Sequence, residues 1–426
     1  MKRGMITAPQ PEAVEAGAIV LRRGGNAVDA AIVCALVQGV VDPQMCGLAG
    51  FGTMHLYLPK KNFHGFIDFH TRAPAAVRED MWEDLIEGEA RDGFGFFLKG
   101  RVNEVGYQSI MVPGSLKAYH EAIEEHGTMD WKDICQPAID QADAGFIVRP
   151  HVHQFWTRSD DDGRIPTADK IKFTAAGRRI YCGANGEIAA LGSLVRNPDM
   201  AETLRRIARG GADVFYSGDL AEEIAGDIQA HGGLLSLNDL KAYRTGRADP
   251  LWSSYRGYRV ATNQPPGGGV MLVEMLNILE NFDLAAMGHN SPDYIGTVAE
   301  AMKYATIDKD TRVGDPRFVD VPLDELLAKP YAAGLAAAIE RGEVAHVERI
   351  DKIEESRDTT HLCAIDADGN AVSMTHSLGM PSGVVTPGLG IMYNGCMSVF
   401  DPRPGRAGSI APGKSRFTAM APTIVF

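Results

Sequence analysis

Residues 358–373 read DTTHLCAIDADGNAVS, and this stretch decides the fold of the chain. A threonine pair precedes a short apolar segment, an Asp-Gly turn and a second strand-like segment, which is the pattern of a β-hairpin. Cleavage of the peptide bond before Thr359 would give that residue a free α-amine. An amine and a hydroxyl on one residue supply a general base and a nucleophile together. The stretch therefore predicts a hairpin that begins with a candidate nucleophile.

The composition is that of an ordinary globular protein. The chain has 426 residues, of which 45% are hydrophobic and 23% charged, and this length allows a large core. The formal net charge is -13. Because an acidic protein repels phosphate backbones, we expect no nucleic-acid partner.

The N-terminal region carries no signal-like or membrane-spanning pattern. Residues 1–5 are basic, but no apolar segment follows them. The apolar run Ala27–Val41 contains Asp29 and Gln38 and is too short to span a bilayer. We therefore expect no membrane partner and a cytoplasmic location, or a periplasmic or secreted one if a leader has been removed.

The cysteines are scattered. They stand at positions 34, 46, 135, 182, 363 and 396, with no CxxC spacing. This pattern argues against a zinc site and against a disulfide framework. We expect neither a metal nor another cofactor.

Hydrophobic periodicity and turn residues predict the order of the elements. Helices are expected over 12–21, 27–41, 270–284 and 291–309 and over most of 115–150 and 197–245, strands over 53–58, 63–68 and 255–261, and a solvated charged connector over 340–358. This order is not the regular alternation of a doubly wound fold. It predicts packed sheets with helices outside, in one continuous domain.

Several further motifs accompany the hairpin. They are GGNAVDAA at 24–31, DPQ at 42–44, VPGS at 112–115, DVFYSG at 213–218, PPGGG at 265–269 and GDP at 314–316. Together with DTTH at 358–361, they resemble the blocks of the γ-glutamyltranspeptidase family of N-terminal-nucleophile hydrolases, in the same order. The resemblance covers essentially the whole chain.

The resemblance implies an α+β fold of the four-layer αββα sandwich type. It also implies a precursor that cuts itself between Asp358 and Thr359. Residues 1–358 would form a large-subunit portion and residues 359–426 a small-subunit portion of one continuous domain. The two fragments would stay together as a heterodimer, and such heterodimers could pair again.

Two residues are candidates for catalysis. The family mechanism assigns nucleophilic attack to Thr359, and Ser377 stands where the family has a threonine that hydrogen-bonds the nucleophile. Serine keeps the hydroxyl that this role needs. We interpret His361 and His376 as packed side chains, because the α-amine already serves as the base.

The substrate-binding motif departs from the family. Residues 68–74 read DFHTRAP, so His70 stands where the family has the arginine that grips the substrate's α-carboxylate. Arg72 lies two places further, on the same face if the strand continues. A guanidinium binds a carboxylate through two hydrogen bonds and an imidazole cannot. Arg72 is therefore either a substitute for the family arginine or a surface side chain.

Three other substrate-binding positions also differ. Gly379 replaces the family's asparagine, and Thr418-Ala419 replaces its Ser-Ser pair. The acidic pair that would receive a glutamyl α-amine is missing from NGCMSVF at 394–400. These changes favour an acyl group other than a free γ-glutamyl.

Two groups of glycines leave two interpretations open. They stand at 47, 50 and 52 and at 267–269. Glycine allows positive φ and close backbone approach, either to a substrate or within a turn. The sequence does not separate these roles.

The sequence thus predicts a self-processing amide hydrolase or acyltransferase. γ-Glutamyl transfer or hydrolysis, as in glutathione metabolism, is the activity of the family. The alternatives are an amidase or acylase on a non-glutamyl amide, for example an oxamate-like one, and an inactive relative. The family continues beyond the position of Phe426 with a Gly-Gly oxyanion loop, so we expect this chain to be truncated. Each missing oxyanion donor would cost roughly 10²–10³-fold in rate.

Overall fold

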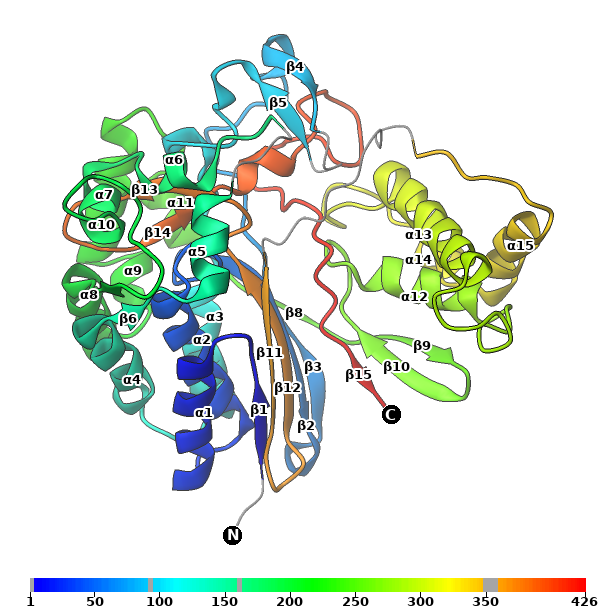
Figure 1. The fold of residues 1–426 in the computed structure, drawn as a ribbon, viewed down its shortest axis with the longest axis horizontal. Coiled ribbons are helices and arrows are strands. Elements are labelled where there is room, and N and C mark those ends of the chain that lie inside the picture. The colour runs from blue at the N-terminus through cyan, green and yellow to red at the C-terminus, as the bar shows by residue number, and fades with distance from the viewer. Residues whose placement is uncertain (1–3, 91–94, 159–162, 348–358) are drawn as a thin grey trace.

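The fold is organised by a six-stranded antiparallel sheet made from both ends of the chain (Figure 1). The computed structural model describes residues 4–90, 95–158, 163–347 and 359–426. In spatial order the strands are β1 (Met5–Thr7), β11 (Thr360–Ile365), β12 (Ala371–Ser377), β2 (Phe51–Leu58), β3 (Phe63–Phe69) and β8 (Gly246–Ala248). The predicted hairpin after Thr359 is confirmed as β11 and β12, and it lies inside the sheet.

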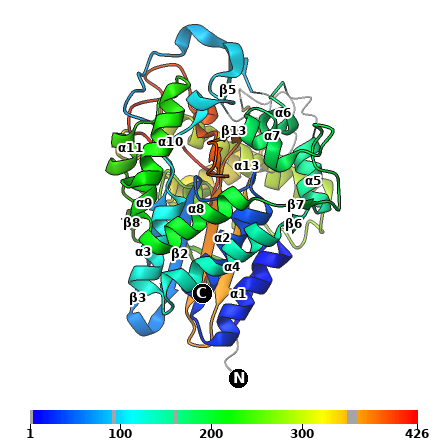
Figure 2. The same ribbon diagram turned by 90° about the vertical axis from the view of Figure 1, so that its left-hand side faces the viewer.

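A helical layer covers one face of this sheet (Figures 1 and 2). It contains α1 (Pro11–Arg23), α2 (Ala27–Val41), α3 (Ser115–His126), α4 (Trp131–Ala144) and α8 (Pro198–Gly210). Every residue of α2 is buried. Its first turn is fixed by a capping box, in which Asn26 accepts from the Asp29 amide and the Asp29 carboxylate accepts from the Asn26 amide.

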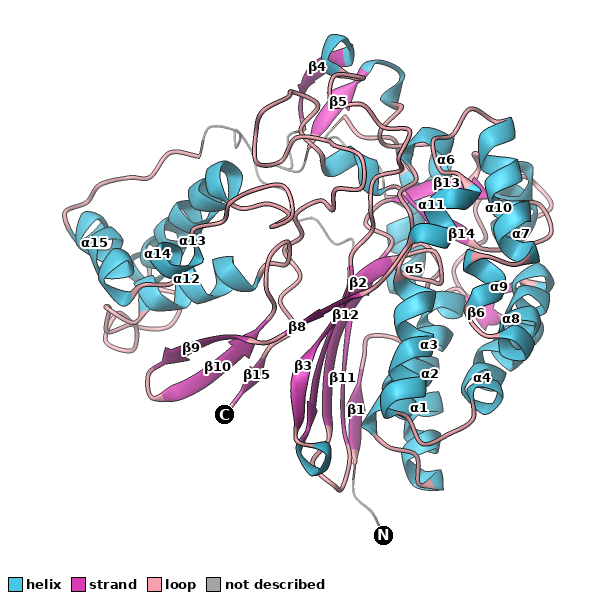
Figure 3. Cartoon of the chain, turned by 180° about the vertical axis from the view of Figure 1, so that it is seen from behind, coloured by secondary structure: helices cyan, strands magenta, loops and turns pink. Residues whose placement is uncertain are grey.

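A second, three-stranded sheet faces the other side of the first (Figure 3). Its strands are β15 (Ile424–Val425), β10 (Tyr258–Thr262) and β9 (Leu251–Tyr255), and its outer helices are α12 (Gly269–Leu279), α13 (Pro292–Arg312), α14 (Leu323–Leu326) and α15 (Lys329–Glu340). Aromatic rings join the sheets: the His64 ring lies 5.2 Å from Trp252, and Tyr57 lies 5.2 Å from Phe426. The structure therefore has four layers in the order helices, sheet, sheet, helices, which confirms the predicted αββα sandwich.

The remaining elements lie around the upper end of the sandwich and beside the first helical layer (Figure 1). They are the hairpins β4–β5 (Ile86–Glu89, Phe96–Leu98), β6–β7 (Phe146–Ile147, Leu194–Val195) and β13–β14 (Pro381–Val385, Met392–Asn394), and the helices α5 (Pro150–Thr157), α6 (Thr167–Ile171), α7 (Ala175–Tyr181), α9 (Asp213–Tyr216), α10 (Asp219–Ala230) and α11 (Leu237–Ala242).

One strand prediction is wrong. The segment 255–261 is not a single strand, because β9 and β10 pair antiparallel around a turn at Arg256 and Gly257. Both residues have positive φ, 49° and 87°, as a tight hairpin turn requires. Of the predicted charged connector 340–358, residues 348–358 lie outside the described residues.

A buried carboxyl group lies within the second helical layer. Glu274 of α12 is 1% exposed. Burial, together with the hydrogen bond and charge of Asp308, raises the pKa of Glu274 to about 9. Asp308 in turn accepts from the Tyr331 hydroxyl at 2.6 Å and pairs with Arg312 at 3.3 Å. Glu274 is therefore protonated at neutral pH, and its carboxyl O–H donates a hydrogen bond to the Asp308 carboxylate.

This carboxyl group makes the stability of the fold dependent on pH. Between the ordinary carboxyl pKa and about 9, the folded protein holds a proton that the unfolded chain releases. The free energy of unfolding should therefore fall as pH rises, by about 1.4 kcal/mol per pH unit at most from this group. Glu274→Gln keeps a donor for Asp308 and cannot ionise. We expect it to be more stable than the wild type at pH 8 and nearly equal at pH 5, measured by urea unfolding.

A matched control is Glu15→Gln. Glu15 pairs with Arg22 on the surface, with both side chains more than half exposed, so its loss should change stability by less than about 0.5 kcal/mol. Parallel pH curves for the wild type and Glu274→Gln would show that Glu274 is ionised in the folded protein.

Candidate functional site

The candidate nucleophile lies at the beginning of β11. Thr359 is exposed and directly precedes the strand, whereas Asp358 lies outside the described residues. Within the hairpin Thr360 pairs with His376. Continuing this register by one residue places Thr359 opposite Ser377, the last residue of β12. The strand pairing therefore brings together the two residues to which the sequence assigned catalytic roles.

Ser377 is held by the turn that follows it. Its side chain is buried, and its hydroxyl oxygen accepts a hydrogen bond from the Gly379 amide at 2.8 Å. Gly379 has φ of +69°, a conformation that favours glycine. On its other side Ser377 pairs with Phe51 of β2. Thr359, Ser377 and Phe51 thus form a row across one end of the sheet.

The opposite face of this sheet end is tied to the helices by a buried polar network. The Gln38 side chain of α2 donates to the Thr360 hydroxyl at 3.1 Å and accepts from His376 Nε2 at 3.0 Å. The Tyr119 hydroxyl then donates to His376 Nδ1 at 2.7 Å. Burial and the nearby His361 lower the pKa of His376 to about 3. His376 is neutral and packed, and it fixes the end of the hairpin.

His70 connects the first sheet to the segment before β15. Its Nδ1 donates to the Asp68 carboxylate, and its Nε2 lies 2.8 Å from the Thr418 hydroxyl. Burial acts to raise the pKa of Asp68, but the charge and hydrogen bonds of His70 and the charge of Arg72 bring it below the ordinary value. The His70 ring is 4% exposed and uses both nitrogens on these partners. It therefore serves as a link between layers.

Arg72 does not lie on the strand face that the sequence suggested. That placement required the strand to continue, and β3 ends at Phe69, so strand alternation does not reach position 72. Arg72 forms an isolated bridge with Val112. Its guanidinium lies 5.8 Å from the centre of the Tyr243 ring and donates to the Arg244 carbonyl at 3.2 Å. These contacts hold Arg72 at the half-buried edge of the site.

The loop of glycines holds the segment that contains Thr418 and Ala419. The Thr418 amide donates to the Pro266 carbonyl at 2.8 Å, and the Gly268 amide donates to the Met420 carbonyl at 2.7 Å. A Cβ at Gly268 would lie 2.7 Å from the Ala419 carbonyl oxygen. Backbone packing within the chain therefore accounts for glycine at position 268. The exposed Ala419 is presented beside this loop.

The same packing accounts for two glycines of the other group. A Cβ at Gly50 would lie 2.4 Å from the Ser377 carbonyl oxygen, and one at Gly52 would lie 2.3 Å from the Thr375 carbonyl oxygen. β12 can pair closely with β2 because these positions lack side chains. The contacts of Gly50 and Gly52 thus show close backbone approach within the protein, a role that differs from both interpretations offered by the sequence.

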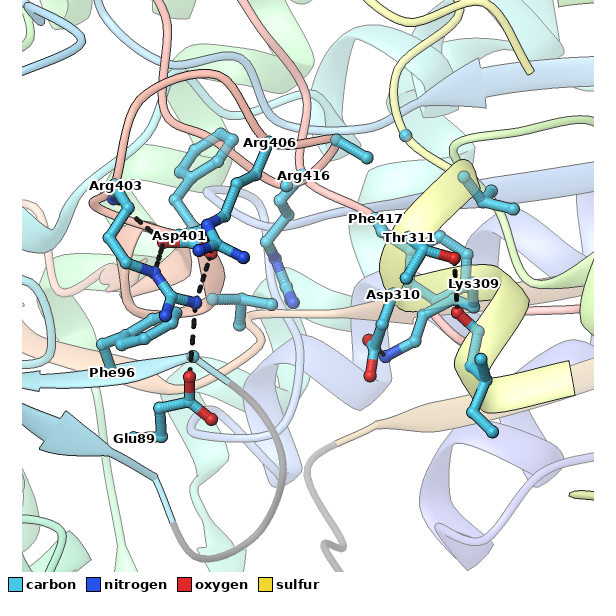
Figure 4. Close-up of a pocket in the computed structure, with 18 of the residues that line it drawn as sticks. Glu89, Phe96, Lys309, Asp310, Thr311, Asp401, Arg403, Arg406, Arg416 and Phe417 are labelled. Atoms are coloured by element: carbon cyan, nitrogen blue, oxygen red, sulfur yellow. Dashed lines mark hydrogen bonds and ion pairs between the residues drawn. The ribbon is translucent and has the colours of Figure 1, made fainter. Parts of the chain in front are cut away.

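A cavity of about 590 Å³ opens between the end of α13 and the segment 399–417. Its charged lining side chains are Glu89, Lys309, Asp310, Asp401, Arg403, Arg406, Lys414 and Arg416. Figure 4 shows Arg416 between the group formed by Asp401 and Arg403 and the group formed by Lys309 and Asp310. Sequence analysis did not single out Arg416. The only sequence signal is its position two residues before Thr418.

In the described part of the chain, no group of three or more His, Cys, Asp or Glu side chains is placed to hold a metal ion. Among the same residues, no helix is long and apolar enough to cross a membrane.

Comparison with known proteins gives consistent matches over the whole chain. The acylase ACY 1 proenzyme of a Pseudomonas species is 37% identical over 99% of this chain and 74% of its own length. The glutathione hydrolase proenzyme of Escherichia coli is 34% identical over 100% of this chain and 73% of its own length. Both kinds of relative match at similar lengths and identities.

Solved structures match in the same way. A cephalosporin acylase from Bacillus halodurans superposes with a TM-score of 0.83 at 28% identity and covers 100% of this chain and 75% of the acylase. The γ-glutamyltranspeptidase of Helicobacter pylori gives 0.69 at 27% identity and covers 82% of this chain and 92% of that chain. The γ-glutamyltranspeptidase family model matches residues 13–426. The chain therefore belongs to the γ-glutamyltranspeptidase family, as its motifs predicted.

Proposed function

We propose that this protein is a self-processing amide hydrolase whose nucleophile is Thr359. The observation that carries the proposal is the position of Thr359, exposed at the start of β11 and opposite Ser377 in the strand register. A strand that begins with the nucleophile presents a free α-amine and a hydroxyl together once the preceding bond is cut. The family membership and the relatives named as proenzymes support the same conclusion.

Maturation requires one peptide bond to break. The Thr359 hydroxyl attacks the Asp358 carbonyl carbon, and the acyl group moves from the Thr359 nitrogen to its oxygen. Water then hydrolyses this ester, which leaves a carboxylate on Asp358 and a free amine on Thr359. The two products, 1–358 and 359–426, remain joined because β11 and β12 are paired with strands of the large fragment on both sides.

Turnover reuses the same hydroxyl. The α-amine, with an ordinary pKa of about 8, accepts the hydroxyl proton as Thr359 Oγ1 attacks the substrate amide. The proton then passes to the leaving amine, and an acyl ester remains on Thr359. Water hydrolyses the ester in an amidase or acylase, whereas an acceptor amine takes the acyl group in a transferase.

The residues near the site favour an acyl group without an α-amine. The stretch 394–400 contains no carboxylate. Its Asn394 side chain is buried and bonded to backbone: it donates to Ala49 and Met111 at 2.9 Å and accepts from the Met111 amide at 3.0 Å. This amide is therefore committed to holding the loop. We propose a non-glutamyl amide as the substrate and γ-glutamyl hydrolysis as the second candidate.

Self-cleavage is tested by intact mass under denaturing conditions. We expect the purified wild type to give two fragments that meet at Asp358 and Thr359, and Thr359→Ala to remain one chain of 45.9 kDa. Thr360→Ser is the matched control, since it keeps a hydroxyl for Gln38 and leaves the nucleophile intact. Cleavage of Thr359→Ala at the same bond, or an uncut wild type after long incubation, would contradict the proposal and favour an inactive relative.

Ser377 is expected to position the nucleophile. Ser377→Ala removes a buried hydroxyl beside Thr359, and we expect self-cleavage to slow by about 10- to 100-fold, the effect of losing one to two hydrogen-bond equivalents. Ser377→Thr should retain most of the rate. Ser373→Ala, on the same face of β12, is the control. Equal rates for Ser377→Ala and Ser373→Ala, from mass spectra taken over time, would remove Ser377 from the mechanism.

Substrate choice is tested with two anilides that differ only in the α-amine. For the mature protein, we expect kcat/KM for glutaryl p-nitroanilide to exceed that for γ-glutamyl p-nitroanilide by about tenfold or more, because no acidic pair is present to receive the ammonium group. Release of p-nitroaniline gives the rates. Preference for the γ-glutamyl compound would support the second candidate.

A further inference from the structure

A chain of buried hydrogen bonds runs from the C-terminal end of α2 to the start of β11. Asp42 caps that end of the helix and is 1% exposed. The Gln10 side chain donates to Asp42 Oδ2 at 2.8 Å, and the Gln38 side chain donates to Gln10 Oε1 at 2.6 Å. Gln38 also donates to the Thr360 hydroxyl at 3.1 Å. Four buried side chains thus connect the end of α2 to the residue that directly follows Thr359.

The charge of Asp42 decides the direction of this chain. An ionised carboxylate can only accept hydrogen bonds, whereas an amide side chain has one end that donates and one end that accepts. Gln10 must therefore turn its NH2 group to Asp42 and its oxygen to Gln38. Gln38 in turn must direct its NH2 group to Gln10 and Thr360. Each amide of the chain has a single orientation while Asp42 is ionised.

The same direction extends to His376. With its NH2 group committed, Gln38 presents Oε1 to His376 Nε2, which lies 3.0 Å away and must carry the ring proton. His376 Nδ1 is then the acceptor for the Tyr119 hydroxyl at 2.7 Å. Because burial, with the charge of His361, lowers the pKa of His376 to about 3, the ring is neutral. Its tautomer therefore reports the direction of the chain.

A neutral carboxyl group at position 42 would favour the opposite direction. Asp42 Oδ1 has no hydrogen-bond partner among the described residues, so a proton finds an acceptor only on Oδ2, which faces Gln10. Both amides would then turn over, the Thr360 hydroxyl would donate to Gln38, and the proton of His376 would move to Nδ1. The side chains of the reversed chain keep their partners, so the carboxylate is what selects the observed direction.

The groups that can titrate around Asp42 come from α5 and from the turn after α2. His151 Nε2 of α5 lies 3.8 Å from Asp42 Oδ2, and the His151 side chain is 44% exposed. Cys46 in the turn is neutral, because burial and the charge of Asp42 raise the pKa of its thiol. Arg149, two residues before His151, is paired with Glu12 of α1 at 2.7 Å. Burial raises the pKa of Asp42 to about 6, and a positive charge on His151 opposes this rise.

We propose that Asp42 is a positioning residue for the nucleophile: its carboxylate fixes the direction of the chain through Gln10 and Gln38, and this direction holds the start of β11 in place. The inference rests on the proposed function of Thr359. Thr360 directly follows the nucleophile, so the hydrogen bond from Gln38 to Thr360 sets where Thr359 begins. A support that exchanges between two directions would hold the reacting hydroxyl less precisely.

The first test is the pH dependence of self-cleavage, followed by mass spectra taken over time. Thr359 has no α-amine in the uncut chain, so that group cannot titrate. We expect the wild-type rate to fall as pH drops through about 6, because Asp42 takes up a proton there. Asp42→Asn keeps the size of the side chain without its charge. It should cleave about 5- to 10-fold more slowly at pH 7.5, the effect of about one hydrogen bond, and should lack this fall.

Two further variants separate Asp42 from its surroundings. His151→Gln removes the cation that lowers the pKa of Asp42, so the fall in rate should move to higher pH while the rate at pH 8 is kept. Glu12→Gln is the matched control, because it removes a carboxylate that pairs with Arg149 at the same junction of α1 and α5. Wild-type rates in Asp42→Asn at every pH, or an equal loss in Glu12→Gln, would overturn the proposal.

A second readout does not depend on cleavage. In Thr359→Ala, which stays one chain, the nitrogen chemical shifts of the imidazole ring give the tautomer of His376, and its signals are identified by their change in Tyr119→Phe. We expect the proton on Nε2 at pH 7.5 and mainly on Nδ1 at pH 5, where Asp42 is protonated and His376 is still neutral. With Asp42→Asn added, the ratio of tautomers should be equal at both pH values.

The outcomes keep this inference apart from the function on which it rests. If the wild type cuts itself and Asp42→Asn does so equally well, the nucleophile proposal stands and Asp42 is not a positioning residue. If the wild type does not cut itself, the proposed function fails, and a pH-dependent tautomer of His376 still shows that Asp42 directs the chain. A tautomer that is the same with and without the carboxylate, at both pH values, would overturn that direction.

Discussion

The structure depends on the antiparallel pairing of β11 and β12 with strands from the beginning of the chain. β1 lies on one side of this hairpin and β2 on the other, so residues after position 358 occupy the interior of a sheet that residues 5–69 largely form. Each backbone hydrogen bond between these strands contributes little stability alone. Loss of the hairpin, however, would leave β1 and β2 with unpaired buried edges. A cut before Thr359 would therefore release a chain end without releasing the strand.

This constraint also decides where chemistry can occur. The beginning of β11 is tied on its helical side to the neutral network of Gln38, His376 and Tyr119. At the same end of the sheet, Phe51 of β2 contacts Arg416, which lines the cavity. The network holds the hairpin end without adding charge. Charged groups gather on the cavity side, where a ligand can reach them. Rigid support on one face and charged side chains near the other suit a nucleophile that must be held still while its substrate is recognised.

The sequence predicted much of this because its strongest signals are local. The Asp-Gly turn and alternating pattern give the β11–β12 hairpin, and Asn26 gives the start of α2. The short strand β1 lacked such a signal, since three residues carry no clear period. The turn at Arg256 and Gly257 was missed because it lacks the usual Asn-Gly or Asp-Gly pair.

The site was predicted less completely, because its contacts join distant segments. Thr359 and Ser377 follow from the motif, and the register of one hairpin brings them together. The role expected for Arg72 depended on how far β3 continued, and it ends at Phe69. Arg416 could not be recognised from its neighbours in sequence, since its position depends on Phe51 and Gly379.

The packing of Arg416 against Gly379 suggests how specificity can change while the nucleophile is kept. A Cβ at position 379 would lie 2.8 Å from Arg416 Nη2, so a side chain there would require the end of the arginine to shift. The Ser377 hydroxyl accepts from the backbone amide of residue 379, a hydrogen bond that does not require a particular side chain at that position. The residue at position 379 can therefore change without a change in Thr359 or Ser377.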